Sequence, residues 1–256
     1  MNNISHQEED FIEKSLKSLK DEWIYLVLVF IPWVLLLILS KFSLIKATMS
    51  LDRGLTPPIL PLIGSELFIS NIKINEWGTE IEYAIKGKSS ELIMKIFSFV
   101  VVVYYFFIYS LYSGRKLKES NFILPIIIAF LFVLLIGFWR KLQYFVISIF
   151  GLILALVIPA KNDGFSFTDS FRESFRNFKE NWLEMILLLV LVLGLYSFTT
   201  IITQEIGYWL LEFLDLSYEA EKIFIFLLLS FLVSTIITFQ IILLTNYYLS
   251  KKDSNK

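Results

Sequence analysis

The sequence predicts an all-α membrane protein with six transmembrane helices and a parallel internal repeat. Three observations lead to this prediction. The chain of 256 residues is 56% hydrophobic and contains 25 Phe, which is more apolar surface than a soluble domain of this size buries. Six uncharged runs of 18 to 28 residues occur along it, and a helix of about 20 residues spans the roughly 30 Å hydrocarbon layer. A 14-residue amphipathic motif occurs twice.

The repeat aligns Asp10–Trp23 with Asp169–Trp182 at a shift of 159 positions. In both copies the apolar residues fall at i, i+4, i+7 and i+11, which places them on one side of an α-helix. Each copy therefore predicts an amphipathic helix that leads into a span, with Thr168 and Asp169 as cap candidates for the second helix. We expect its stripe, with Phe175 and Phe178, to lie in apolar contact and Glu173 to lie on the opposite face. The second span of each copy opens alike, with Lys95–Phe99 and Lys222–Phe226.

The uncharged runs and their flanks divide the chain into segments. The six predicted transmembrane spans are residues 23–40, 92–114, 120–139, 142–160, 183–204 and 222–250. Pro32 either kinks the first span or is simply tolerated there, because proline is frequent in membrane helices. Pro125 lies in the first turn of the third span, where its missing N–H matters little, and Pro159 is expected to close the fourth. Only Arg140 and Lys141 separate the third and fourth spans, which predicts a tight central hairpin with Gly137 near its tip.

The remaining segments are polar. Residues 1–22 are predicted to be a polar tail and the first amphipathic helix, 165–182 the second one, 205–221 a short outer segment and 251–256 a C-terminal tail. Residues 41–91 contain a Pro-rich stretch, and an alternating pattern on both sides of Gly78 predicts a small β-hairpin near 68–86. Compared with the second copy, the first has an insertion of 32 residues between its spans, which we assign to the Pro-rich stretch and the hairpin.

Positive charges predict the orientation in the membrane. If the N-terminus is cytoplasmic, the inner segments contain thirteen Lys and Arg residues and the short outer segments contain three, Arg140, Lys141 and Lys222. The positive-inside rule then places both termini in the cytoplasm and residues 41–91 outside. Residues 1–22 are acidic on balance and have no cleavage-site pattern, so we expect the first span to stay in the protein.

The composition excludes several function classes. The net charge of −1 argues against a nucleic-acid partner, and a chain with no cysteine has no disulfide and no thiolate nucleophile. His6, the single histidine, lies in the polar tail with no second His or Cys to share a metal. No phosphate-binding, dinucleotide-binding, metalloprotease or hydrolase motif occurs. We therefore predict no catalytic, cofactor-binding or metal-binding residues, and no cofactor. The expected partner is the lipid bilayer, with a homo-oligomer or a membrane protein partner as open alternatives.

Three features have two interpretations each. Glu184 is either an interfacial carboxylate near the headgroups or a buried proton site. A polar stripe on the last span either forms hydrogen bonds between helices or lines a pathway; its members are Ser234, Thr235, Thr238, Gln240 and Asn246. The second amphipathic helix either lies at the membrane interface or binds a cytosolic partner.

The residues Ile158–Ala160, followed by a polar loop and by Phe171, Ser174, Phe175, Phe178, Asn181 and Trp182, form a motif that leads into the fifth span. This motif resembles that of a large family of six-helix prokaryotic membrane proteins, which includes the YciC-like proteins and the membrane domain attached to some glycerophosphodiester phosphodiesterases. The outer insertion departs from that family, and no phosphodiesterase domain is present. The resemblance implies a protein of the prokaryotic cytoplasmic membrane with a role in envelope or lipid physiology, and it implies no catalytic residues.

These observations lead to two functional hypotheses. The first is a non-enzymatic membrane protein that organises the envelope or is the partner of another membrane complex. The second is a transporter or permease component for a lipid-like or small hydrophobic solute, which the parallel repeat and the polar stripe favour. An enzyme that acts on lipid has no supporting residues.

Overall fold

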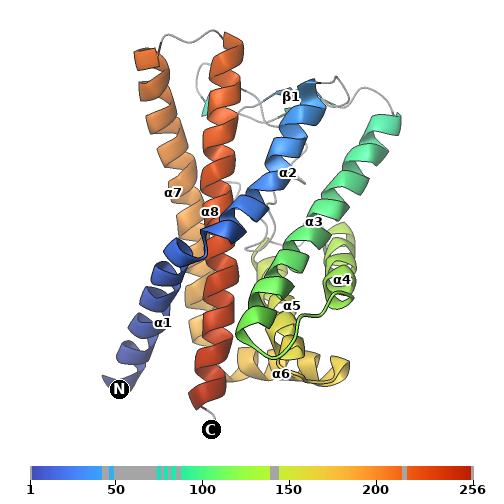
Figure 1. Cartoon of the computed structure of the whole chain (residues 1–256), viewed down its shortest axis with the longest axis vertical. Coiled ribbons are helices and arrows are strands. Elements are labelled where there is room, and N and C mark those ends of the chain that lie inside the picture. The colour runs from blue at the N-terminus through green and yellow to red at the C-terminus, as the bar shows by residue number, and fades with distance from the viewer. Residues whose placement is uncertain are drawn as a thin grey trace.

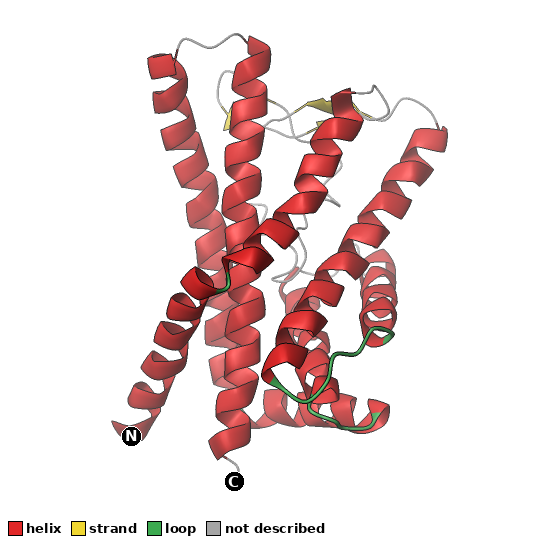
Figure 2. Ribbon diagram, in the orientation of Figure 1, coloured by secondary structure: helices red, strands yellow, loops and turns green. Residues whose placement is uncertain are grey.

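The computed structural model describes residues 2–41, 46–48, 74–75, 78–79, 82–84, 88–138, 144–214 and 218–254. This part of the chain is a helical bundle of eight α-helices (Figures 1 and 2). Both ends of the described chain lie at the same end of the bundle (Figure 1). We call this end the termini end; α6 and the loop between α3 and α4 lie there too.

The helices follow the order of the predicted segments. Their bounds are α1 Asn2–Asp21, α2 Trp23–Lys41, α3 Lys88–Lys116, α4 Leu124–Phe138, α5 Tyr144–Asn162, α6 Phe167–Glu180, α7 Trp182–Leu214 and α8 Tyr218–Ser254. Each predicted span overlaps one helix: α2, α3, α4, α5, α7 and α8 in that order. The tip of the predicted central hairpin, with Arg140 and Lys141, lies outside the described residues, but α4 and α5 do pack against each other.

Three helix ends differ from the prediction. Helix α1 begins at Asn2, so the residues expected to form a polar tail are helical. Helix α4 begins only at Leu124, because the loop before it is fixed by side-chain hydrogen bonds described below. Helix α5 continues past Pro159 to Asn162. A proline removes only its own N–H, and the carbonyl of Pro159 accepts the N–H of Asp163 at 2.9 Å, which holds the last turn.

Short strands lie between α2 and α3. β1 (Lys46–Thr48) pairs antiparallel with β4 (Glu82–Ala84), and β2 (Ile74–Asn75) pairs with β3 (Gly78–Thr79). The pairing of β2 with β3 lies inside the predicted hairpin, whereas β4 pairs with β1 outside it. The other residues between 68 and 86 are outside the described part, so the hairpin as a whole stays a prediction.

Helix α8 is the centre of the bundle. It packs against α1, α2, α3, α5 and α7, and its side chains from Ile236 to Tyr248 are buried. Among the described residues, Ser230–Lys252 is the one stretch that is long and apolar enough to cross a membrane. Buried core helices of soluble proteins share that length and composition, so this stretch alone gives weak evidence for a membrane location.

The junctions α1–α2 and α6–α7 have the same local structure. In the first, the N–H of Glu22 donates to the carbonyl of Ser18 at 2.9 Å; in the second, the N–H of Asn181 donates to the carbonyl of Asn177 at 3.0 Å. At the shift of 159 positions, Ser18 corresponds to Asn177 and Glu22 corresponds to Asn181. The helices before the junctions differ in direction: α1 runs along α8, whereas α6 lies across the termini end (Figure 1).

Exposed apolar side chains form long ridges on the outside of the bundle. The ridge on α2 consists of Ile24, Val27, Ile31, Leu35 and Ile38. The ridge on α7 consists of Leu183, Leu187, Val190, Phe198, Ile201, Trp209 and Phe213. Consecutive members are three or four residues apart, or about twice that, so each ridge follows one side of its helix. Soluble monomers rarely expose contiguous apolar surface on this scale.

Candidate functional site

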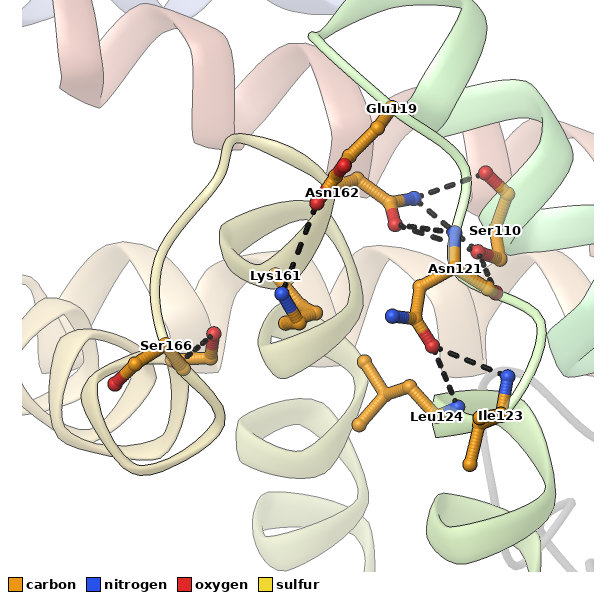
Figure 3. A network of polar contacts seen from close by, with 9 residues as sticks. Ser110, Glu119, Asn121, Ile123, Leu124, Lys161, Asn162 and Ser166 are labelled. Atoms are coloured by element: carbon orange, nitrogen blue, oxygen red, sulfur yellow. Dashed lines mark hydrogen bonds and ion pairs between the residues drawn. The ribbon is translucent and has the colours of Figure 1, made fainter.

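The described polar residues are concentrated at the termini end, where Asn162 forms the most connected group (Figure 3). Asn162 is the last residue of α5 and is fully buried. Its amide nitrogen donates to the Ser110 carbonyl at 2.9 Å and to the Ser113 hydroxyl at 2.7 Å. Its amide oxygen accepts the backbone N–H of Asn121 at 3.1 Å. One side chain thereby joins the end of α5 to the last turns of α3 and to the following loop.

The same contacts fix the start of α4. The backbone carbonyl of Asn162 accepts the N–H groups of Lys118 and Glu119 at 3.1 and 3.0 Å. The side-chain oxygen of Asn121 accepts the N–H groups of Ile123 and Leu124, at 3.1 and 2.8 Å. Leu124 is the first residue of α4 and Ile123 is the residue before it, and N–H groups at a helix start have no partner inside the helix. Asn121 therefore caps the start of α4.

Two lysines at the end of α8 tie it to α5 and α7. The Lys252 ammonium lies 2.6 Å from Oδ1 of Asp163, the residue that follows α5, and the Tyr248 hydroxyl donates to Oδ2 of the same carboxylate at 3.4 Å. The Lys251 ammonium lies 2.5 Å from the Glu184 carboxylate. Asp163 is buried and Glu184 is half-buried, so both carboxylates have their countercharge inside the bundle. Glu184 is thus half-buried and paired with Lys251, and its place near the lipid headgroups stays a prediction.

A third ionic group lies at the α1–α2 junction. Glu22 is buried, and its carboxylate accepts from Arg115 at 2.8 Å and lies 3.1 Å from the Lys116 ammonium. A hydrogen bond with Tyr25, followed by the charge of Glu22, raises the pKa of Arg115 above its ordinary value. The last turn of α3 therefore holds the first copy of the repeat by a charge pair.

Helix α6 packs on α5 by a face of small polar side chains. Its buried side chains are Ser170, Ser174 and Asn177, with Ser174 at 0% exposure and its hydroxyl donating to the Ile153 carbonyl of α5. Phe175 of the apolar stripe is 58% exposed, whereas Phe171 and Phe178 pack partly against the core. Small side chains allow α6 to approach α5 closely, and the phenylalanines occupy the flank. Apolar contact of the whole stripe therefore stays a prediction.

Glu173 lies on the side of α6 away from the phenylalanines, as predicted, where it is half-buried and pairs with Arg176 at 2.7 Å. The helix cap differs from the prediction. The cap is Ser166, two residues before the first candidate. Its hydroxyl oxygen accepts the N–H of Asp169 at 3.2 Å and its hydroxyl donates to the Asp169 carboxylate.

The first copy of the repeat shows the same burial pattern. Ser15, which corresponds to Ser174, is fully buried, and its hydroxyl oxygen accepts from the Asn246 amide of α8 at 2.9 Å. Leu16, which corresponds to Phe175, is exposed. A buried serine beside an exposed apolar residue is therefore a property of both amphipathic helices.

The polar stripe on α8 divides into three kinds of residue. Asn246 bonds to another helix, as one of the two interpretations expects. Thr235 and Thr238 donate instead to carbonyls of their own helix four residues earlier, at 2.9 and 2.8 Å. Gln240 is fully buried with neither its amide nitrogen nor its amide oxygen hydrogen-bonded, and the Ser234 hydroxyl is also unbonded.

No part of this polar layer forms a recognisable catalytic arrangement. His6 lies in α1, and within the described ranges no three His, Asp or Glu side chains are grouped so that they could hold a metal ion. Sequence reasoning missed Asn162 and the buried serines. The spacing Ser170-x-x-x-Ser174 was the available signal for a close helix contact. Comparison of the chain with family models, with curated proteins and with solved structures finds no match.

Proposed function

We propose that this chain is a six-span protein of a prokaryotic cytoplasmic membrane with both termini in the cytoplasm. In this proposal the spans lie in α2, α3, α4, α5, α7 and α8, and the two copies of the repeat flank the central α4–α5 hairpin. The exposed apolar ridges on α2 and α7 are the observation that favours it most, because lipid is the solvent that such surfaces require.

The aromatic residues of α7 support the placement. Trp182 is 54% exposed and Trp209 is 65% exposed. They are 27 residues apart, and at about 1.5 Å per residue this separation is about 40 Å, close to the thickness of a bilayer with its headgroups. Tryptophan is enriched at both membrane–water interfaces. The uncharged stretch between Glu184 and Glu205 then fills the hydrocarbon layer.

For the activity we propose a non-enzymatic role, in envelope organisation or as a partner in a membrane complex. The polar layer at the termini end consists of hydrogen-bonded and ion-paired groups that hold helices together, with Asn162, Asp163 and Glu22 as its centres. Such a layer fixes the shape of the cytoplasmic surface that a partner would meet. The resemblance to the YciC-like proteins points in the same direction and is likewise a proposal.

The experiment is affinity purification after reversible crosslinking in intact cells, followed by quantification of the captured proteins. We expect one membrane protein in stoichiometric amount that is lost when Glu22→Gln and Asp163→Asn are combined. A folded and membrane-inserted parent chain that captures no such protein in any growth condition contradicts the role as a complex partner.

One observation favours the second candidate, a transporter component. Gln240 presents a buried amide without a partner near the middle of a proposed span, and such groups often line a solute or water site. Solute-dependent uptake in proteoliposomes that disappears in Gln240→Leu would favour transport. Asn246 is a poor probe, because its amide is bonded to Ser15 and its replacement disturbs packing.

A further inference from the structure

Helix α6 has an apolar edge that the described part of the chain leaves uncovered. Phe167 and Phe175 are exposed, and so is Trp182 just after the junction with α7. Phe171 and Phe178 lie next to them and pack partly against the core. The exposed edge continues directly into the α7 ridge, which begins at Leu183.

The side chains around α6 are sorted by type. At 3.6 residues per turn, four groups of side chains follow one another around the helix. They are, in order, the face that packs on α5 (Ser170, Ser174 and Asn177), the phenylalanines (Phe171, Phe175 and Phe178), the cations (Arg172, Arg176 and Lys179) and the acids (Asp169 and Glu180). The cations therefore lie between the apolar edge and the acids. In a bilayer the polar headgroups likewise lie between the acyl chains and the water.

We propose that α6 lies in the plane of the cytoplasmic leaflet, with Phe175 and Trp182 inserted at the boundary between headgroups and acyl chains. This inference rests on the proposed membrane location. The direction of α6 across the termini end agrees with it (Figure 1). So does the continuity of its apolar edge with the α7 ridge, because a single bilayer then covers both surfaces.

The insertion is driven by apolar contact, with little contribution from lipid charge. Two of the three cations already have partners on the helix: Arg176 lies 2.7 Å from Glu173, and Arg172 lies 3.9 Å from Asp169. A helix with this charge balance lacks the excess of free cations that makes polybasic segments select anionic lipids. The same charge balance favours the bilayer over an acidic protein surface as the partner that covers the apolar edge.

The absence of cysteine makes a direct test simple, because each introduced cysteine is the single labelling site. Phe175→Cys, Leu183→Cys, Leu187→Cys and Glu180→Cys are labelled with an environment-sensitive fluorophore and reconstituted into nanodiscs of phosphatidylcholine and phosphatidylglycerol. Quenching is measured with lipids that carry a nitroxide near the headgroup and, separately, with iodide in the water. Position 180 is the matched control, since it is exposed on the acidic side of the same helix.

We expect the lipid nitroxide to quench labels at 175 and 183 several-fold more than the label at 180, and iodide to show the reverse order. Replacing all phosphatidylglycerol by phosphatidylcholine should leave this ratio unchanged. Equal iodide quenching at 175 and 180 would overturn the inference. Protection of 175 from both quenchers would overturn it too, because it indicates that a second copy of this chain covers the apolar edge. If Leu187→Cys on the α7 ridge is also open to iodide, the membrane location itself is wrong, and that result is separate from a failure confined to α6.

Discussion

Replacing Asn162 should destabilise the protein more than any single change on its surface, because its amide joins three segments. Asn162→Ala removes the donors to the Ser110 carbonyl and the Ser113 hydroxyl and the acceptor of the Asn121 N–H. The Asn121 N–H then loses its partner beside a fully buried site, at about 1–3 kcal/mol for a buried group left unsatisfied, whereas the Ser113 hydroxyl loses one hydrogen bond and still donates to the Ser110 carbonyl. A small cavity adds to this. The total expected loss is about 3–5 kcal/mol.

The measurement is thermal unfolding in mild detergent, followed by the fluorescence of the six tryptophans. For a chain of this size each kcal/mol lowers the melting temperature by roughly 2–4 °C, so the expected drop is on the order of 10 °C. Asn162→Asp keeps the shape and the acceptor but points a second oxygen at the Ser110 carbonyl, so it should be at least as damaging.

Asn181→Ala is the control for the Asn162 variants. Its amide bonds only to the Asn177 carbonyl, at 3.2 Å and half-buried, and the drop should be small. A melting temperature of Asn162→Ala close to that of Asn181→Ala would refute the role of Asn162 as the junction of α3, α4 and α5.

Three further predictions follow from the polar groups and the insertion. Replacing Arg115 and Lys116 together by Met should lower the melting temperature more than Glu22→Gln does. The first change leaves a buried carboxylate unpaired, whereas the second leaves cations that reach water. The reverse order in the same assay would contradict the ion pairing of Glu22 with these two residues. Gln240→Leu should raise stability by about 1–3 kcal/mol, since it removes buried polar atoms that have no partner; a loss of stability would mean that the amide has a partner such as bound water. Replacing residues 56–87 with a short Gly/Ser linker should leave insertion and most of the thermal stability unchanged, because flexible loops of this size close at low entropic cost; aggregation of this variant would show that the segment belongs to the core.

The helices and their junctions are well predicted from the sequence, because uncharged runs and a repeated motif report them directly. The backbone hydrogen bonds at Glu22 and Asn181 are also related by the shift of 159 positions. The repeat in the sequence, and not its composition, predicts this correspondence. The face of α6 that would be buried was not predictable from its apolar stripe. Apolar side chains on a packed face and on an exposed edge have the same hydropathy, so hydrophobicity alone does not separate them.

The buried polar contacts were harder to predict than the helices. The Asn162 contacts join residues about 40 to 50 positions apart, and hydropathy contains no information about such pairing. Pro159 was misjudged for a related reason. A proline close to a helix end is compatible with either a stop or one more turn, and the hydrogen bonds of Asn162 and Asp163 favour the longer helix.

The most direct test of the membrane topology is a set of six reporter fusions, each assayed with a periplasmic enzyme and with a cytoplasmic fluorophore. Fusions after residues 118, 165 and 256 should report the cytoplasm, because α6, the Asn162 loop and the C-terminus lie at the termini end. Fusions after residues 88, 141 and 215 should report the outer side. A cytoplasmic signal after residue 88, or equal signals after 88 and 118, would contradict the six-span topology.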